Sequence, residues 1–157
     1  TTMPQYKKVL DYIEIAKKDG ATLLLGGSPG KAPGCEKGWF VEPTIFGDVK
    51  NTMRIAQEEV FGPVLSIIKF KDEDDAVRIA NDIRFGLAAA AWTKDIGRAI
   101  RMSEKLKAGT IWINTYRAIS YMAPFGGYKQ SGNGREYGEF GVRDFLEIKS
   151  ISGFRVP

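Results

Sequence analysis

Apolar residues recur at helical spacing at the start of the chain and then in short runs. The stripe from Tyr6 to Ala16 has the three- and four-residue spacing of an amphipathic helix, and Gly20 follows it as a left-handed C-cap does. The pattern therefore predicts a helix over residues 4–19. After it we expect a buried strand over 21–25, a surface loop rich in Gly, Pro and Lys over 26–38, and extended segments over 39–46 and 64–70.

Strand and helix patterns alternate in the middle of the chain. Asp72, with Asp75 three residues later, is typical of a capped helix start, and an apolar stripe runs from there to Ile83. A run of small apolar residues over 87–93 then predicts a fully buried strand. After it we expect a helix that begins at Asp95 and ends at Gly109, followed by a β-branched strand over 110–114. This order predicts parallel pairing with right-handed crossovers. The fold class is therefore α/β, an open and mostly parallel sheet with flanking helices.

The last third of the chain has a different character. Glycines are dense between residues 121 and 141, which predicts irregular backbone that passes close to another group. A long loop of this kind inside a compact domain is usually functional. A helical turn over 136–143 and a last strand over 147–153 complete the prediction, and that strand would leave an exposed edge if nothing paired with it.

Composition and charge narrow the class of protein. The 157 residues, 43% hydrophobic and 27% charged, fit one ordinary globular unit, and no apolar run approaches the ~18 residues of a membrane span. The net charge of +4 is spread among 19 acidic residues and forms no basic stripe, so nucleic acid is not an expected partner. The chain opens on an amphipathic helix rather than a secretory leader, and a single cysteine rules out an internal disulfide; we expect a cytoplasmic location.

The residue types present exclude several kinds of catalytic site. The chain contains no histidine, which removes Ser-His and Cys-His nucleophiles and the usual zinc sites. The acidic run 72–75 stands at a helix start rather than at the spacing of a metal-binding loop, so we interpret it as a solvated cap, and no metal is expected. Cys35 lies in the flexible loop 26–38 near Lys31 and Lys37, and we interpret it as an incidental thiol.

Two segments about sixty residues apart stand out. Residues 57–64, Gln-Glu-Glu-Val-Phe-Gly-Pro-Val, place a carboxylate and an aromatic ring just before the strongest strand pattern, where open α/β sheets usually hold ligands. Taken alone, this is equally a polar turn with one core Phe. Residues 123–136 combine glycines, a ring and an Arg-Glu pair, but their spacing fits neither the dinucleotide fingerprint nor the P-loop.

Together the two segments resemble the NAD(P)-dependent aldehyde dehydrogenase superfamily. The runs 38–45, 85–89 and 109–114 also resemble family signatures in the right order, so the resemblance covers essentially the whole chain. It implies that residues 1–146 are the second half of an aldehyde dehydrogenase catalytic domain. It further implies that residues 147–157 are a C-terminal strand and tail through which subunits form a homo-oligomer.

The resemblance also implies roles for individual residues. Glu59 matches the acid that holds a cofactor ribose by its two hydroxyls, and Phe61 matches the aromatic packed near the nicotinamide. Phe125 matches an aromatic of the aldehyde tunnel, with Ile119 also on its wall, and an apolar wall suits an uncharged aldehyde. Glu136 matches an acid that relays protons in some members of the family, and a role in structural pairing is equally open. Glu147 matches an acid that pairs with arginine, and Arg135 is the candidate partner here.

The chemistry that the resemblance implies is oxidation of an aldehyde to a carboxylic acid with NAD or NADP through a thiolate nucleophile. In the family, the thiol, its oxyanion-hole asparagine, the general-base glutamate and the dinucleotide-binding domain precede the segment that matches this chain. We therefore expect these 157 residues alone to be inactive. Two readings stay open, a piece of a complete dehydrogenase or a non-catalytic assembly or binding module of the same fold.

Overall fold

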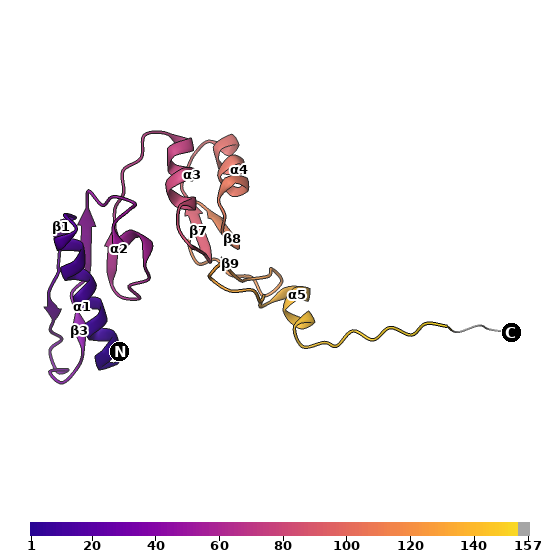
Figure 1. The fold of residues 1–157 in the computed structure, drawn as a ribbon, viewed down its shortest axis with the longest axis horizontal. Helices are drawn as coiled ribbons and strands as arrows, with labels where there is room; N and C mark the ends of the chain where they lie inside the picture. Colours follow the sequence, from indigo (N-terminus) through magenta and orange to yellow (C-terminus); the bar gives the residue numbers. More distant parts are fainter. Residues whose placement is uncertain (154–157) are drawn as a thin grey trace. The chain divides into compact units, whose positions relative to one another are not determined.

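The computed structural model describes residues 1–153, which divide into two compact units (Figure 1). The first unit runs from Thr1 to Asp82, and the second begins at Ile83. A single globular unit was expected from length alone, so the division is a feature that composition did not reveal. The proposed boundary between residues 146 and 147 stays a prediction, and residues 154–157 of the proposed tail lie outside the described part.

The first unit holds a three-stranded sheet and a small hairpin. Its elements are α1 (Met3–Lys18), β1 (Thr22–Leu25), β2 (Pro29–Gly30), β3 (Phe40–Val41), β4 (Thr44–Gly47), α2 (Arg54–Gln57), β5 (Val64–Ser66) and α3 (Glu73–Asn81). The sheet order is β1-β4-β5, with β1 antiparallel and β5 parallel to β4. Strands β2 and β3 pair antiparallel.

Helix α1 forms where its pattern predicted it and carries the core of this unit. The Thr2 hydroxyl accepts from the Gln5 amide at its start, and Gly20 follows its end with φ of 91°. On its inner face, Ile13 is buried, and Phe46 of β4 is fully buried against the same cluster. The core of the first unit therefore lies between α1 and β4.

Three expectations for the first unit are corrected by the structure. Strand β1 forms, but all four of its residues are exposed, so the prediction of a buried strand is wrong. Strand β5 ends at Ser66 rather than Phe70, although the Ile67 amide still donates to the Phe46 carbonyl at 2.8 Å. The loop 26–38 is not purely irregular, because it contains strand β2.

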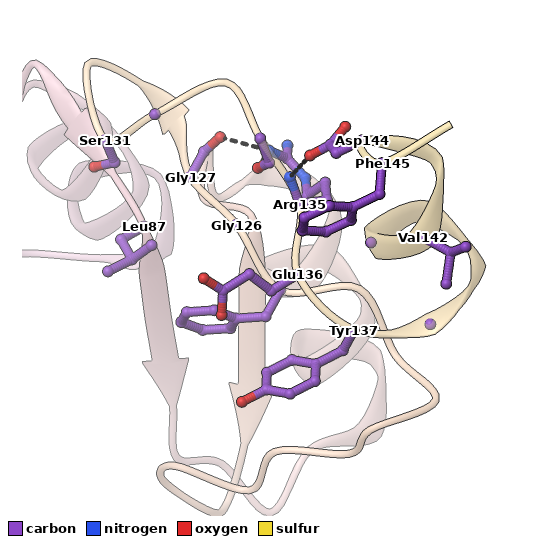
Figure 2. A pocket seen from close by; sticks show the side chains of 15 residues that line it. Leu87, Gly126, Gly127, Ser131, Arg135, Glu136, Tyr137, Val142, Asp144 and Phe145 are labelled. Atoms are coloured by element: carbon purple, nitrogen blue, oxygen red, sulfur yellow. Dashed lines mark hydrogen bonds between the residues drawn. The ribbon is translucent and has the colours of Figure 1, made fainter. Parts of the chain in front are cut away.

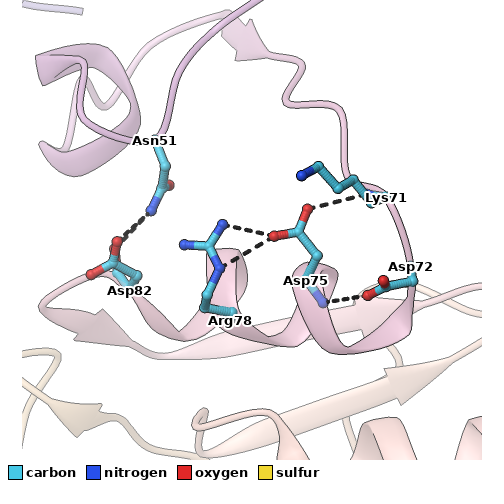
Figure 3. A network of polar contacts seen from close by, with 6 residues as sticks. All are labelled: Asn51, Lys71, Asp72, Asp75, Arg78 and Asp82. Atoms are coloured by element: carbon cyan, nitrogen blue, oxygen red, sulfur yellow. Dashed lines mark hydrogen bonds and ion pairs between the residues drawn. The ribbon is translucent and has the colours of Figure 1, made fainter.

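The predicted cap of α3 is confirmed (Figure 3). The Asp75 amide donates to Asp72 Oδ1 at 2.9 Å, and the Asp75 carboxylate accepts from the Lys71 amide at 3.1 Å and pairs with Arg78 at 2.7 Å. The hydrogen bond from Arg78 is the main reason that the pKa of Asp75 lies below its ordinary value. At the other end, Asn51 donates to Asp82 at 2.9 Å. The acidic run 72–75 is thus a helix start, as interpreted.

The second unit contains two short two-stranded sheets. Its elements are β6 (Phe85–Gly86), β7 (Ala88–Ala91), α4 (Ile96–Lys105), β8 (Thr110–Ile113), β9 (Tyr128–Lys129) and α5 (Gly138–Arg143). Strands β7 and β8 pair in parallel and are connected through α4, as the alternating pattern predicted. Strand β6 pairs antiparallel with β9. The α/β class is confirmed, but the strands of residues 1–153 form one sheet of three strands and three sheets of two rather than one open sheet, and only the β4–β5 and β7–β8 pairs are parallel.

Several details of the second unit differ from expectation. Strand β7 is half-buried and Ala88 is exposed, so full burial is wrong. Helix α4 starts at the Asp95 cap but ends at Lys105, so Gly109 does not close it; the Gly109 amide instead donates to the Gly86 carbonyl at 3.0 Å. Helix α5 begins at Gly138 rather than at Glu136. Residues 147–153 form no strand within this chain and continue from α5 as an exposed tail (Figure 1).

The described residues lack two kinds of feature. Through residue 153, no helix combines the length and apolar character that crossing a bilayer requires. In the same part of the chain, no three Cys, Asp or Glu side chains gather as metal ligands would.

Candidate functional site

Segment 58–62 of the first unit carries the two residues proposed to contact the cofactor. It begins where α2 ends, at Glu58, and leads to β5. Glu59 is exposed, and the ring of Phe61 is 75% exposed. Phe61 has φ of 57°, a left-handed conformation that is unusual for a bulky side chain. An acid and a ring therefore stand out from the surface within three residues.

Side-chain hydrogen bonds fix this segment at both of its ends. The side-chain Nε2 of Gln5 donates to the backbone carbonyls of Val60 and Phe61 at 3.0 and 2.9 Å. At Glu58, the Tyr12 hydroxyl donates to Oε2 at 2.6 Å and the Arg54 guanidinium donates to both oxygens. The hydrogen bond to Glu58 is the main cause of a raised pKa at Tyr12, because an anionic neighbour disfavours the phenolate.

Aromatic rings line the surface beside Phe61. A hollow of about 350 Å³ includes Tyr6, Trp39 and Phe61, and the Tyr6 and Trp39 rings lie 5.4 Å apart between centroids. Their tilted contact fixes two of the rings in place. The first unit therefore presents Phe61 at the edge of an apolar, aromatic surface.

Phe125 and Glu136 meet in the glycine-rich loop of the second unit. They face each other in an antiparallel bridge, and each amide donates to the other's carbonyl at 2.8 Å. Both line a hollow of about 730 Å³ with Leu87, Tyr137, Val142 and Phe145 (Figure 2). Phe125 is half-buried and Glu136 is exposed. The loop thus brings a ring and a carboxylate to one mostly apolar hollow.

Arg135 supports the same loop from within. Its Nη1 donates to the carbonyl of Gly127 at 3.0 Å (Figure 2) and to that of Gly134 at 2.8 Å. Its guanidinium lies 5.6 Å from the Tyr128 ring centroid. A Cβ on Gly126 would overlap the Gly134 carbonyl, which explains the glycine there. Glu147 is exposed, and within residues 1–153 no ion pair joins it to Arg135. Their pairing stays a prediction.

Ile119 lies apart from that hollow. It belongs to a segment without helix or strand, is 56% exposed, and is not among the residues that line the hollow of Phe125. The Trp112 indole donates to the Ala118 carbonyl at 2.8 Å and ties this segment to β8. The structure therefore brings together Phe125, Arg135 and Glu136 but not Ile119.

Two side chains that hold the backbone in place, Gln5 and Asn114, were not predicted to do so. Gln5 is 55 residues from Val60, and no local pattern marks so distant a contact. Asn114 exchanges two 2.8 Å hydrogen bonds with the Thr93 backbone, which fastens the ends of β7 and β8. It belongs to the signature 109–114, the one signal that pointed to it. Cys35 is exposed in its loop, and its interpretation as an incidental thiol stays a prediction.

Known proteins match this chain over nearly its full length. The model of the aldehyde dehydrogenase family matches residues 1–151. Human aldehyde dehydrogenase 1A1 is 51% identical over 94% of the chain, and aldehyde dehydrogenase, cytosolic 2, of Macroscelides proboscideus is 49% identical over 94%. A structure of betaine aldehyde dehydrogenase from Staphylococcus aureus in complex with NAD+ superimposes with a TM-score of 0.90 and 44% identity over 93% of the chain. The chain spans 29%, 60% and 29% of these proteins, respectively.

Proposed function

Because this chain belongs to the aldehyde dehydrogenase family, we propose that it is part of an enzyme that oxidises an aldehyde to a carboxylic acid with NAD+ or NADP+. The relative from Staphylococcus aureus whose structure contains NAD+ supports this cofactor class. A cytoplasmic location is proposed in the same way, from the relative named cytosolic. The chain's own residues supply one part of the cofactor surface and one part of the substrate surface.

The cofactor surface that we propose is the Glu59 and Phe61 pair. The single observation that carries it is the outward ring of Phe61, 75% exposed on a turn that Gln5 holds. With the rings of Tyr6 and Trp39 it forms a contiguous apolar patch, and such patches often mark the surfaces that bind ligands or partners. Glu59 stands beside it as a free acceptor for neighbouring hydroxyls, which is what a ribose offers. When bound, the nicotinamide accepts hydride, and the protein's part is to hold and orient it.

The substrate surface that we propose is the hollow of Phe125, with Ile119 contributing from its own segment. Its ring and aliphatic neighbours exclude water and suit the uncharged aldehyde. Glu136 has an exposed carboxylate at the wall of this hollow, and no side chain of residues 1–153 pairs with it. This favours the proton-relay role over a structural pair. The exposed tail 147–153 is the proposed site of homo-oligomer contact.

Residues 1–157 alone are proposed to turn over no aldehyde. They contain no histidine, and their one thiol, Cys35, is exposed in a surface loop. A nucleophilic thiol requires a neighbouring base, cation or helix start that lowers its pKa. Incubating the purified chain with aldehyde and NAD+ should form no NADH. Steady NADH formation from a clean preparation contradicts this part of the proposal.

The cofactor roles can be tested by grafting. We would replace the matching segment of human aldehyde dehydrogenase 1A1 with this chain and follow NADH formation. Glu59→Gln weakens a charge-assisted contact, so the KM for NAD+ should rise about tenfold or more. Phe61→Leu should also impair turnover, because the smaller side chain orients the nicotinamide poorly. Phe70→Leu is the matched control, since Phe70 is 63% exposed in the same unit. Equal kinetics in all of these variants overturns the assignment.

A further inference from the structure

One face of α1 touches segment 58–62 at three successive points. Gln5, Val9 and Tyr12 have the i, i+4 and i+7 spacing that places side chains on one face of a helix. Gln5 donates to two carbonyls of the segment, and Tyr12 donates to Glu58. Between them, a Cβ on Gly62 would come within 2.5 Å of a Val9 methyl carbon, so the backbone passes directly over Val9. We call these three residues the α1 stripe.

The α1 stripe contacts four residues of the segment: Glu58, Val60, Phe61 and Gly62. The contacts to Val60 and Phe61 go to backbone carbonyls, so they fix the backbone and leave the side chain of Phe61 free. This matters because φ of 57° at Phe61 is a strained conformation that surrounding contacts must impose. In the left-handed conformation the ring points outward. The two proposed cofactor contacts are thus the side chains that the stripe leaves exposed.

We propose that Gln5 is a positioning residue for cofactor binding, which locks the left-handed turn at Phe61 so that the ring is presented to the nicotinamide. The part of this inference that concerns the nicotinamide rests on the proposed function. The lock itself is a property of this chain. Val9 supports it by packing, and Tyr12 with Arg54 fixes the preceding residue, Glu58.

The test uses the 157-residue chain with its phenylalanines replaced by 4-fluorophenylalanine. The fluorine resonance of residue 61 is assigned by its loss in Phe61→Leu, and that of buried Phe46 reports whether the core of the unit is folded. In Gln5→Leu, the resonance of residue 61 should split or broaden, because the turn samples more than one conformation, while that of Phe46 stays in place. A resonance of residue 61 that keeps its position and width in Gln5→Leu overturns the proposal.

A matched control exists in the same unit. Gln57 also donates two side-chain hydrogen bonds to carbonyls, to Asn51 at 2.7 Å and to Asp82 at 2.8 Å. Gln57→Leu loses the same kind of contact, and the resonance of residue 61 should not change. If Gln57→Leu disturbs it as much as Gln5→Leu does, the effect is general loosening of the unit and the proposal is wrong.

A second variant covers the case in which Gln5→Leu does not fold. Gln5→Glu has nearly the same shape, but its carboxylate cannot donate to the two carbonyls at neutral pH. In this variant the resonance of residue 61 should split or broaden at pH 7. It should partly recover its wild-type position and width below a pH of about 4, where a protonated carboxyl donates again. A purely structural role predicts no such pH-dependent recovery, so an unchanged resonance across this range overturns the proposal.

Adding NAD+ to the labelled chain separates this inference from the proposed function. A shift of the residue 61 resonance on addition of NAD+, weaker in Gln5→Leu, supports both. If NAD+ shifts the residue 61 resonance neither in the wild-type chain nor in the grafted enzyme, yet Gln5→Leu still splits or broadens it, the lock stands and the cofactor role of Phe61 fails.

Discussion

The two units present their candidate residues by different physical means. In the first unit, segment 58–62 lies on a helix whose inner face belongs to a core of fully buried residues, with Ile13 at 1% and Phe46 at 0% exposed. The buried apolar residues described in the second unit are only Ala99, Leu106 and Trp112, none of which lies in the loop of Phe125 and Glu136. That loop depends on paired backbone amides and on glycines that let the chain approach itself.

This difference indicates which changes each unit tolerates. A site on a packed core responds to lost volume, because burial and close packing supply most of its stability. A site on backbone contacts responds to added volume and to a lost hydrogen bond. The following substitutions test that contrast, beginning with the largest expected effect.

Phe46→Ala should cause the largest loss of stability. Phe46 is fully buried between α1 and its own sheet, and removing a buried ring costs about 3–5 kcal/mol of unfolding free energy. Urea unfolding followed by circular dichroism measures the loss, and amide hydrogen exchange should show the greatest loss of protection in β4. Phe70→Ala is the control, because Phe70 is 63% exposed and its truncation should change stability by only about 0.5 kcal/mol. Equal losses in the two variants contradict a core centred on Phe46.

Local signals explain how much of the fold the sequence predicted. The caps at Asp72 and Asp95 and the glycine after α1 depend on contacts within a few residues, and all three were predicted correctly. Burial depends on what covers a face, and that information is not local. For this reason β1 and β7 were found as strands but were wrongly predicted to be buried.

The candidate site shows the same limit. Glu59 and Phe61 were singled out by a resemblance, since spacing alone left segment 57–64 equally explained as a polar turn. The pairing of Phe125 with Glu136 across the ten intervening residues was not predicted, because glycine-rich backbone has no periodicity to read. Gln5 was missed for a related reason, since its partners are more than fifty residues away.

Gly126→Ala should have the next largest effect, through added volume in the second unit. Its new Cβ would overlap the Gly134 carbonyl and lie 2.6 Å from Arg135 Cδ, so the loop must shift. Overpacking of this kind costs about 1–3 kcal/mol. Urea unfolding gives the cost, and exchange of the Phe125 and Glu136 amides reports the loop. Gly134→Ala is the control, because its nearest atom, Asp144 Oδ2, is 3.4 Å away. If both variants behave alike, close approach at Gly126 is not what shapes the loop.

Ser131→Ala should have a smaller effect on the same loop. The Gly86 amide donates to the Ser131 hydroxyl at 2.9 Å, and Gly86 is buried, so the substitution leaves this amide without its partner. The expected loss is about 0.5–1.5 kcal/mol in urea unfolding. Ser103→Ala removes a 2.7 Å bond to the Ile100 carbonyl on the exposed side of α4 and should change little. A loss at Ser103 as large as that at Ser131 would show that burial of the amide is not the deciding factor.

The smallest expected effect returns to the first unit and concerns pH. The pKa of Tyr12 is raised in the folded chain, chiefly by its hydrogen bond to Glu58, so the folded state binds the phenolic proton more tightly than the unfolded state does. Stability from this bond is therefore fully present below the unfolded pKa of about 10 and is lost as pH rises through the folded pKa. Urea midpoints measured across this range should fall with pH, and Tyr12→Phe should flatten the slope. Tyr121→Phe, at a ring 78% exposed, should leave the slope as it is. If Tyr12→Phe keeps the full slope, the hydrogen bond to Glu58 does not anchor the start of segment 58–62. The outward position of the Phe61 ring would then depend on Gln5 and Val9 alone.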